Sequence, residues 1–256
     1  MEHGDANMDD AVRKPYDLYF ASGTYDRRYP RPNPRVLAHV RRLLPPEAHV
    51  IDYGCGSGRY LVPLRPHLGR AAGFDICPTA LGLLRDRLAA GGGAPVEVLG
   101  PDPASLPDHV ARHGPADLLL CLFGVLSHVT PRSARADLLG RFRDLLRPGG
   151  RLLVSVPNRQ RRFAREQRAV RPGTEIHYRR RIAGGDIELP YQLFDPALLA
   201  EELTAAGFEP EGVWAESTLP EAWLTGGGIA GLLDAGLTPL CPARWGYGIL
   251  MQAVSR

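Results

Sequence analysis

The sequence predicts an α/β protein with a doubly wound, Rossmann-like, mainly parallel sheet. Between residues 49 and 156, short runs of β-forming residues alternate with segments that have helical periodicity. One of the runs, residues 116–122, is apolar almost throughout, which is typical of a central parallel strand that is buried on both faces. This alternation of strands and helices requires a parallel sheet with right-handed crossovers.

Each predicted element has a local reason. Apolar residues at helical spacing predict a helix at 35–44, which ends before two prolines. Strands at 49–53, 70–74 and 96–99 alternate with helices at 58–67 and 78–90, and Pro63 and Pro66 should shorten the first of these helices. After the central strand we expect a helix at 131–146, a strand at 151–156, a helix at 196–206 and a final antiparallel pair at 208–215 and 247–254. Residues 225–243 are not assigned to an element.

Composition excludes several classes of protein. The 256 residues are 44% hydrophobic and 23% charged, with a net charge of +3, which suits a single globular domain with a large core. Lys14 is the only lysine among 31 basic residues, and this bias is typical of a GC-rich genome more than of a nucleic-acid surface. The four cysteines are far apart, so we predict neither a metal site nor a disulfide framework. A polar N-terminus and a longest apolar run of half a membrane span, 118–126, favour a cytoplasmic protein without a membrane partner.

Two segments depart from the regular pattern. Residues 1–34 form an N-terminal arm before a single domain at 35–256. Its first 12 residues are expected to be mobile, and 13–34 are too broken for a long helix yet hold four of the nine tyrosines. The arm is either packed over the domain by its aromatic side chains or acts as a lid over a ligand. Residues 159–185 hold nine arginines, and they form either an insert that covers the substrate side or a solvated, charged helix and loop.

The strongest motif is Val-Ile-Asp-Tyr-Gly-Cys-Gly-Ser-Gly-Arg at residues 50–59. Alternate glycines allow a sharp turn and a close approach of a ligand to the backbone, and the helix that follows offers free N–H groups. A dinucleotide fingerprint would need a third glycine at position 59, where the chain has Arg59, and a P-loop would end in Gly-Lys-Ser/Thr. The motif therefore predicts a cradle for a nucleotide-like or anionic ligand of another kind.

The pattern Asp-x-Gly-x-Gly-x-Gly resembles motif I of the class I S-adenosylmethionine-dependent methyltransferases. Asp75 ends the next strand 21 residues after Gly54, residues 100–107 resemble the Asp-Ala-x-x-Leu-Pro stretch of that class, and Leu-x-Pro-Gly-Gly precedes the strand at 151–156. The resemblance is strong over 49–156 and weak over 186–254. It implies a seven-stranded sheet with an antiparallel last strand, and S-adenosylmethionine as the cofactor with S-adenosylhomocysteine as the product.

The resemblance also implies the cofactor site. The motif I residues should hold the methionine part, Asp75 the ribose and Asp102 the adenine, with the end of the fourth strand beside the sulfonium. Because Pro103 has no N–H, a second bond to adenine has to come from elsewhere, such as Ala104, and Asp102 can also be a simple turn residue between prolines. The expected cofactor residues are Asp52, Gly54, Gly56, Gly58, Asp75, Ile76, Asp102, Leu122 and Phe123.

Methyl transfer from a sulfonium depends mainly on alignment, which can contribute ~7–11 kcal/mol, and it needs a general base only when the acceptor must lose a proton early. His128 follows the central strand and is the first candidate for a base, or else a structural hydrogen bonder. His177 in the insert and Tyr25 in the arm are further catalytic candidates. Substrate contacts are expected from Tyr16, Arg28, Arg161, Arg162 and Tyr178.

Three functions fit these residues. The first is a methyltransferase for a small molecule of secondary-metabolite type, with an acidic or phosphorylated acceptor drawn by the arginines. The second is a tRNA methyltransferase for a modified wobble uridine, which the arm, His128 and the closing Gly-Ile-Leu-Met-Gln loosely resemble, although Asn33 stands where that family has an aromatic residue. The third is a non-catalytic cofactor-binding protein. Low net charge and the near absence of lysine favour the first function and make nucleic acid the less favoured partner. The chain is expected to be a monomer or a homodimer.

Overall fold

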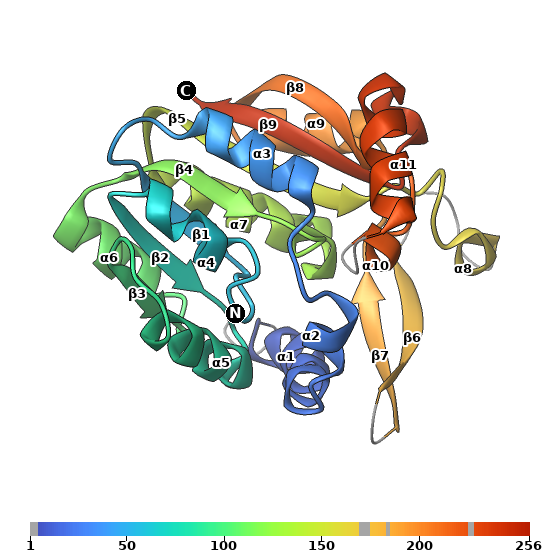
Figure 1. The fold of residues 1–256 in the computed structure, drawn as a ribbon, viewed down its shortest axis with the longest axis horizontal. Helices are drawn as coiled ribbons and strands as arrows, with labels where there is room; N and C mark the ends of the chain where they lie inside the picture. The colour runs from blue at the N-terminus through green and yellow to red at the C-terminus, as the bar shows by residue number, and fades with distance from the viewer. Residues whose placement is uncertain (1–4, 169–174, 183–184, 225–227) are drawn as a thin grey trace.

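A seven-stranded sheet forms the centre of the computed structural model, which describes residues 5–168, 175–182, 185–224 and 228–256 (Figure 1). The strand order is β3-β2-β1-β4-β5-β9-β8, and β9 runs antiparallel to both of its neighbours. The fold class predicted from the sequence is confirmed. The strands are β1 (His49–Tyr53), β2 (Arg70–Phe74), β3 (Val96–Leu99), β4 (Ala116–Cys121), β5 (Leu146–Pro157), β8 (Phe208–Ser217) and β9 (Gly248–Ser255).

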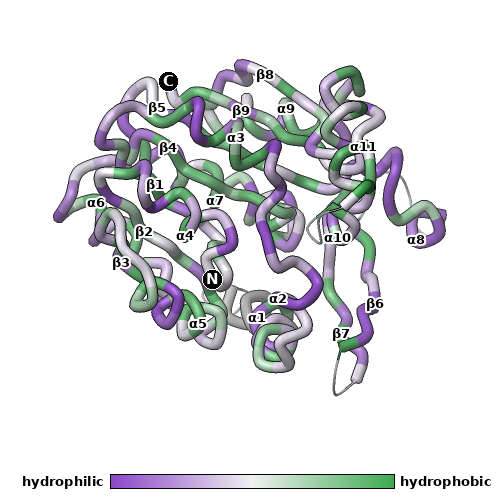
Figure 2. Tube along the Cα trace, in the orientation of Figure 1, coloured by the Kyte–Doolittle hydropathy of each residue, from purple (hydrophilic) through white to green (hydrophobic). Residues whose placement is uncertain are grey.

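The sheet is buried on both faces because its central strands alternate between two cores. Leu118 and Leu120 of β4 pack toward one face, and Leu119 and Cys121 pack toward the other. The apolar strands stand out between more polar helices when the chain is coloured by hydropathy (Figure 2). The first face is covered by α3 (Pro34–Leu43), α4 (Leu61–Leu64), η1 (Arg65–His67) and α5 (Pro78–Ala89), and the second by α6 (Ser105–His113), α7 (Arg132–Leu145) and α9 (Pro196–Ala205).

The N-terminal arm corrects one prediction. Residues 13–34 were expected to be too broken for a long helix, yet α1 spans Asp5–Ala21 with Pro15 inside it, and α2 (Thr24–Arg28) follows. Val12, Tyr16, Tyr19 and Phe20 recur at helical spacing, and Val12, Tyr19 and Phe20 are buried. Burial of this aromatic face outweighs the hydrogen bond that Pro15 cannot make. The arm packs against α5 and β7 beyond the sheet (Figure 1).

The arginine-rich insert is a hairpin more than a helix and loop. After α8 (Ala164–Arg168), strands β6 (Ile176–Ile182) and β7 (Gly185–Tyr191) pair antiparallel, so this structure extends past the predicted boundary at residue 185. Residues 169–174 and 183–184 lie outside the described residues. Alternate residues of β6 point to opposite sides, so that Tyr178 is buried while His177 and Arg179 are exposed.

The segment that the sequence left unassigned is mostly helical. Residues 225–243 contain α11 (Ile229–Leu237) and η3 (Thr238–Leu240) and lie between α10 (Glu221–Leu224) and η4 (Ala243–Trp245). Residues 225–227 are not described. This segment connects β8 to β9, beyond the carboxyl end of β5. None of the described helices combines the length and the hydropathy that a membrane-spanning helix needs.

Candidate active site

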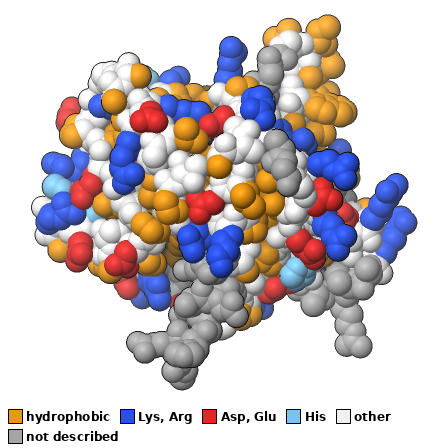
Figure 3. Space-filling model, turned by 90° about the horizontal axis from the view of Figure 1, so that it is seen from below, with side chains coloured by type: hydrophobic (Ala, Val, Ile, Leu, Met, Phe, Trp, Pro, Cys, Tyr) orange, Lys and Arg blue, Asp and Glu red, His pale blue; other side chains and the backbone are white. Residues whose placement is uncertain are grey.

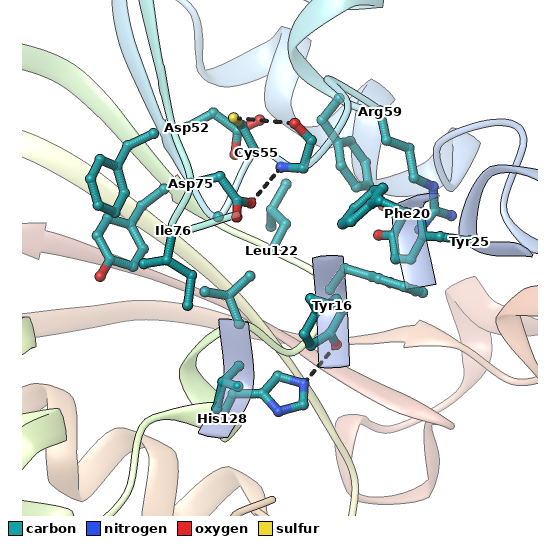
Figure 4. Close-up of a pocket in the computed structure, with 18 of the residues that line it drawn as sticks. Tyr16, Phe20, Tyr25, Asp52, Cys55, Arg59, Asp75, Ile76, Leu122 and His128 are labelled. Carbon is teal, nitrogen blue, oxygen red and sulfur yellow. Dashed lines mark hydrogen bonds between the residues drawn. The ribbon is translucent and has the colours of Figure 1, made fainter. Parts of the chain in front are cut away.

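A cavity lies where β1, β2 and β4 end, and α1 and α2 cover it (Figure 4). This is the edge at which open α/β sheets bind their ligands. Most of the predicted cofactor residues and two of the arm residues meet there. The predicted residues in its wall are Tyr16, Tyr25, Asp52, Gly54, Gly56, Asp75, Ile76, Leu122, Phe123 and His128. We call it the first cavity.

The glycine turn is held against the end of β2 by backbone hydrogen bonds. The N–H groups of Gly54 and Cys55 both donate to the carbonyl of Phe74, at 2.7 and 3.0 Å. Gly54 and Gly56 have φ of 75° and 54°, in the left-handed region that favours glycine. Gly56 then donates its N–H to the Asp75 carboxylate at 2.8 Å, so the turn and the acid fix each other.

Two carboxylates, the buried Asp52 and the partly buried Asp75, stand on either side of this turn. Burial, reinforced by the nearby Asp75, raises the pKa of Asp52 to about 7, and burial raises the pKa of Asp75 to about 6 despite the N–H groups that it accepts. Asp52 is 3% exposed and lines the cavity. Two such groups favour a ligand that brings a positive charge or hydroxyl donors, since either would stabilise the ionised form.

Arg59, directly after the glycine turn, brings the opposite charge into the same cavity. Its Nε donates to the carbonyl of Arg31 at 2.7 Å and its Nη2 to the Glu221 carboxylate at 2.7 Å. Its Nη1 is buried and has no hydrogen-bond partner among the described residues. A buried guanidinium N–H without a partner costs free energy, so this atom fits a ligand carboxylate.

His128, on η2 (Leu126–His128), lies in a different environment from the one a general base requires. Its Nδ1 lies 3.1 Å from the carbonyl of Pro190, which can only accept, so Nδ1 carries the proton. Its Nε2 then accepts the hydroxyl of Tyr16 at 2.8 Å (Figure 4). Burial lowers the pKa of His128 to about 3. From the sequence we expected His128 to have an ordinary pKa near neutrality. The structure corrects this expectation, because the ring is desolvated and both of its nitrogens are hydrogen-bonded.

A second cavity adjoins the first and shares Tyr16, Tyr25 and Phe123 with it. Phe123 has a φ of 63°, a strained value for a residue with a side chain, and such strain is typical of functional sites. Tyrosines from the arm and the insert line most of the second cavity, and charged residues from distant segments complete it. Its other lining residues include Tyr19, Tyr29, Arg162, Tyr178, Arg180, Tyr191, Glu216, Glu221 and Tyr247.

Two titratable groups of the second cavity have pKa values that are shifted toward neutral pH, one from below and one from above. Burial and the neighbouring Glu221 raise the pKa of Glu216, and one of its carboxylate oxygens has no hydrogen-bond partner among the described residues. Burial opposes ionisation of Tyr29 as well, but Arg180 and Arg28 donate to its hydroxyl at 3.2 and 3.0 Å and lower its pKa overall. Groups perturbed in this way suit proton transfer.

Five predicted residues do not line either cavity. Gly58 packs the turn against α5, where a Cβ would lie 2.5 Å from Leu84. Asp102 is exposed and accepts the N–H of Ala104 in its own loop. Arg28 is exposed beside Tyr29, and Arg161 donates to the carbonyl of Trp245. His177 is 61% exposed and lies 3.7 Å from Glu188, because β6 turns it away from the body of the protein.

Other residues of the site were missed. Arg59 had a signal, since it replaces a glycine of a known fingerprint directly after the turn. Tyr29 belonged to the aromatic arm but was not singled out. Arg180 stands in period with Tyr178 and could have been found from strand alternation. Glu216 and Glu221 had no local signal, because only the fold brings β8 and α10 to this edge.

One cluster with metal-ligand chemistry lies away from the cavities. One ligand atom each of Glu97, His109 and His113 lies within 4.8 Å of the others. His109 already uses both ring nitrogens, toward Glu97 at 2.6 Å and His49 at 2.9 Å. We therefore interpret the cluster as a hydrogen-bonded network.

The glycine turn, the strand-end acid Asp75 and the sheet with one antiparallel strand define a class I S-adenosylmethionine-dependent methyltransferase. The chain belongs to the Methyltransferase domain family, whose profile matches residues 25–212. It is 32% identical over 168 residues to a protein of Encephalitozoon cuniculi assigned as a methyltransferase, covering 64% of this chain and 71% of that protein.

Two solved structures share the fold at low identity. The CcbJ methyltransferase of Streptomyces caelestis has a TM-score of 0.64 at 15% identity, covering 88% of this chain and 90% of that one. CalS10 of Micromonospora echinaspora, an amino pentose methyltransferase solved with bound S-adenosylmethionine, has a TM-score of 0.52 at 18% identity, covering 87% and 89%. S-adenosylmethionine is the cofactor of this chain. The two carboxylates fit its ammonium group and its ribose hydroxyls, and the Arg59 nitrogen without a partner among the described residues fits its carboxylate.

Proposed function

We propose that the protein transfers a methyl group to a small molecule that binds in the second cavity. The observation that carries this proposal is the junction of the two cavities at Tyr16, Tyr25 and Phe123. A donor in the first cavity and an acceptor in the second would meet there, behind the arm. CalS10, which shares the fold, is an amino pentose methyltransferase, and this supports a small-molecule acceptor.

In this proposal each wall of the first cavity holds one part of the cofactor. Asp52 binds the ammonium group, Arg59 the carboxylate through its unpartnered Nη1, and Asp75 the ribose hydroxyls, while Ile76 and Leu122 supply apolar walls. The bound sulfonium supplies an electrophilic methyl group for in-line displacement. Tyr25 and Phe123 exclude water and align the acceptor, which is where much of the rate of such a reaction comes from.

The charges of the second cavity favour an acceptor with an N–H or O–H over an anion. Arg162 and Arg180 line it, but so do Glu216 and Glu221, and Arg180 is engaged with Tyr19 and Tyr29. Outside the cavity, Arg179 and Arg181 pair with Glu188 and Asp186. We propose that Glu216 accepts the acceptor's proton and that His128 positions the arm through Tyr16. The wobble-uridine alternative is less favoured, because Arg162 and Arg180 are the described arginines of the insert that line the cavity.

Radiolabelled methyl transfer tests the proposal. The full chain is first titrated with S-adenosylhomocysteine, and then offered amines, phenols, sugars, carboxylic acids and phosphorylated compounds of metabolite size, with bulk tRNA in parallel. We expect product binding and label in an amine or alcohol. Label only in tRNA would contradict the proposal, and product binding with no transfer to any acceptor would support the non-catalytic alternative.

A further inference from the structure

Helix α11 carries its apolar face outward. In a surface helix of a globular protein the apolar stripe faces the core. In α11 and η3 the face toward the protein instead carries Asp234 and Thr238, which are 5% and 1% exposed. The outward face carries Ile229, Leu232, Leu233, Leu237 and Leu240, with exposed fractions of 76, 76, 55, 54 and 85%. The usual arrangement is therefore reversed.

Hydrogen bonds fix this reversed orientation. One Asp234 oxygen accepts the N–H and the hydroxyl of Thr218, both at 2.7 Å, and the N–H of Leu219 at 2.9 Å. The Thr238 hydroxyl lies 3.2 Å from the same Thr218 N–H. A rotation of the helix that buried its leucines would break these bonds and leave the N–H groups of Thr218 and Leu219 without their acceptor, which is costly. The local sequence thus specifies an exposed apolar face.

The face continues onto the neighbouring segments. Trp223 on α10 and Trp245 on η4 are 61% and 55% exposed, and we call these two residues with the five of α11 and η3 the apolar face. Asp234 and Arg244 are the only charged residues between positions 223 and 245. Figure 3 shows hydrophobic side chains gathered on a projecting part of the surface near its upper edge, and Figure 2 colours much of α11 as hydrophobic.

The extent of the apolar face suits a permanent interface. With roughly 180 Å² for a fully exposed Leu or Ile and about 250 Å² for Trp, the seven side chains expose on the order of 900 Å². The largest apolar patch of a monomer is typically ~300–600 Å², and one partner of a standard interface buries ~800 Å². Permanent interfaces are also more apolar than transient ones, whose surfaces must remain soluble alone.

We propose that the apolar face is the two-fold interface of a homodimer. A second copy is present whenever the chain is made, so it can cover the face permanently. A two-fold axis brings the same patch against itself, and the near absence of charge on the face leaves no like charges to repel each other. A different protein partner would need polar or charged groups on the face for discrimination, and these are scarce there.

The interface would also support the second cavity. Glu221 of α10 lines that cavity and pairs with Arg59, and Trp223 of the same short helix belongs to the apolar face. The Asn158 side chain at the end of β5 donates to the carbonyls of Arg244 and Gly246, at 2.9 and 2.8 Å. Covering the apolar face would therefore hold the outer wall of the second cavity in place.

Light scattering after size exclusion tests the dimer with the full chain at about 1–100 µM. The wild type is expected at twice the chain mass of 27.9 kDa, and the double variant Leu232→Glu/Leu237→Glu at the mass of one chain. A Val213→Glu variant is the control, because Val213 is 41% exposed on β8 and is not one of the seven residues of the apolar face, and it should stay dimeric. Circular dichroism and S-adenosylhomocysteine binding show that each variant is folded.

Two results would overturn the proposal: a wild type that runs at the mass of one chain at every concentration, and a dimer that the double variant leaves intact. In the first case, sedimentation of the wild type but not of the folded double variant with vesicles of phosphatidylcholine and phosphatidylglycerol would assign the apolar face to a lipid surface.

Discussion

The two cavities are built in opposite ways. The first is formed by the ends of the adjacent strands β2, β1 and β4, from Asp52 near the end of β1 to Phe123 after β4, together with the arm. The second is assembled from the arm, the insert, β8 and α10, which are up to about 200 residues apart in the chain. A conserved chemistry such as cofactor binding can therefore be recognised from a short motif, whereas the acceptor site depends on long-range assembly.

The two cavities also differ in the charged groups that line them. The first cavity pairs two acids of raised pKa with a guanidinium nitrogen that has no partner among the described residues, which matches a zwitterionic ligand. The second cavity combines Glu216 with several tyrosines, and its Arg180 donates to the hydroxyls of Tyr19 and Tyr29. If this division is correct, single substitutions should affect either cofactor affinity or turnover, and only residues that touch both cavities should affect both.

Glu216→Gln should have the largest effect, and on turnover only. The amide keeps the shape of the side chain but does not accept a proton, and general base catalysis is typically worth ~10²–10⁴-fold. We expect kcat to fall by about that factor with S-adenosylhomocysteine affinity within about threefold of wild type. Glu188→Gln is the matched control, since Glu188 is 50% exposed on β7. An unchanged kcat would remove Glu216 from the reaction.

Arg59→Met should weaken S-adenosylhomocysteine binding by roughly 30–100-fold, because a charge-assisted hydrogen bond worth about 2–3 kcal/mol is lost. The substitution also leaves Glu221 buried without its cation. The double variant Arg59→Met/Glu221→Gln separates the two effects in a calorimetric titration. If the double variant bound the product as tightly as wild type, Arg59 would not bind the cofactor directly. The loss in the single variant would then come from the unpaired Glu221, which lines the second cavity.

The contrast between these two residues shows what the sequence could predict. The strands of the central sheet, the glycine turn and Asp75 follow local rules, and the structure places them where the sequence did, whereas β6 and β7 were not predicted. The contacts and the pKa values of the site residues do not follow from local rules. Asp102 belonged to a matching motif, yet its side chain closes its own loop, and His128 had the right position but is desolvated. Position along the chain predicts proximity better than it predicts protonation.

The errors in secondary structure have related causes. The prolines late in residues 13–34 suggested a broken arm, but the burial of Tyr19 and Phe20 in the fold stabilises α1 up to Ala21, with Pro15 inside it. The nine arginines of residues 159–185 left a solvated helix and loop open as one of two interpretations, although Tyr178 and Ile182 follow the two-residue period of a strand and are buried. In both segments charge or proline was weighed above hydrophobic periodicity, and tertiary packing follows the periodicity.

The pH dependence of product binding tests the two acids of the first cavity. Asp52 titrates near pH 7 in the cofactor-free protein, and the ammonium group of the ligand requires the carboxylate form. Affinity for S-adenosylhomocysteine should therefore fall by up to about tenfold per pH unit below pH 7, with proton release on binding. Calorimetry in buffers of different ionisation enthalpy measures that release. Asp52→Asn should flatten the dependence between pH 6 and pH 8.

The same acid predicts an opposite effect on the stability of the cofactor-free protein. A carboxyl whose pKa is raised by folding stabilises the protein below its unfolded value, and this contribution is lost as pH rises through about 7. Asp52→Asn should therefore raise Tm at pH 8 by roughly 3–8 °C, with a smaller change at pH 5.5, while lowering product affinity. A Tm that drops equally at both pH values would mean that the carboxylate is stabilised by contacts within the protein.

Tyr16→Phe should have the smallest effect, and it should affect binding in both cavities. Loss of its hydroxyl leaves Nε2 of His128 buried without a donor, which costs about 1 kcal/mol and loosens the arm. We expect S-adenosylhomocysteine affinity and KM for the acceptor each to weaken by roughly 3–10-fold, with the pH profile of kcat unchanged. His128→Phe with Tyr16→Phe removes both partners and should recover part of this loss, because neither polar group then remains buried alone. A kcat that collapsed by more than about 100-fold, with product affinity intact, would return His128 to the reaction as a base acting through Tyr16.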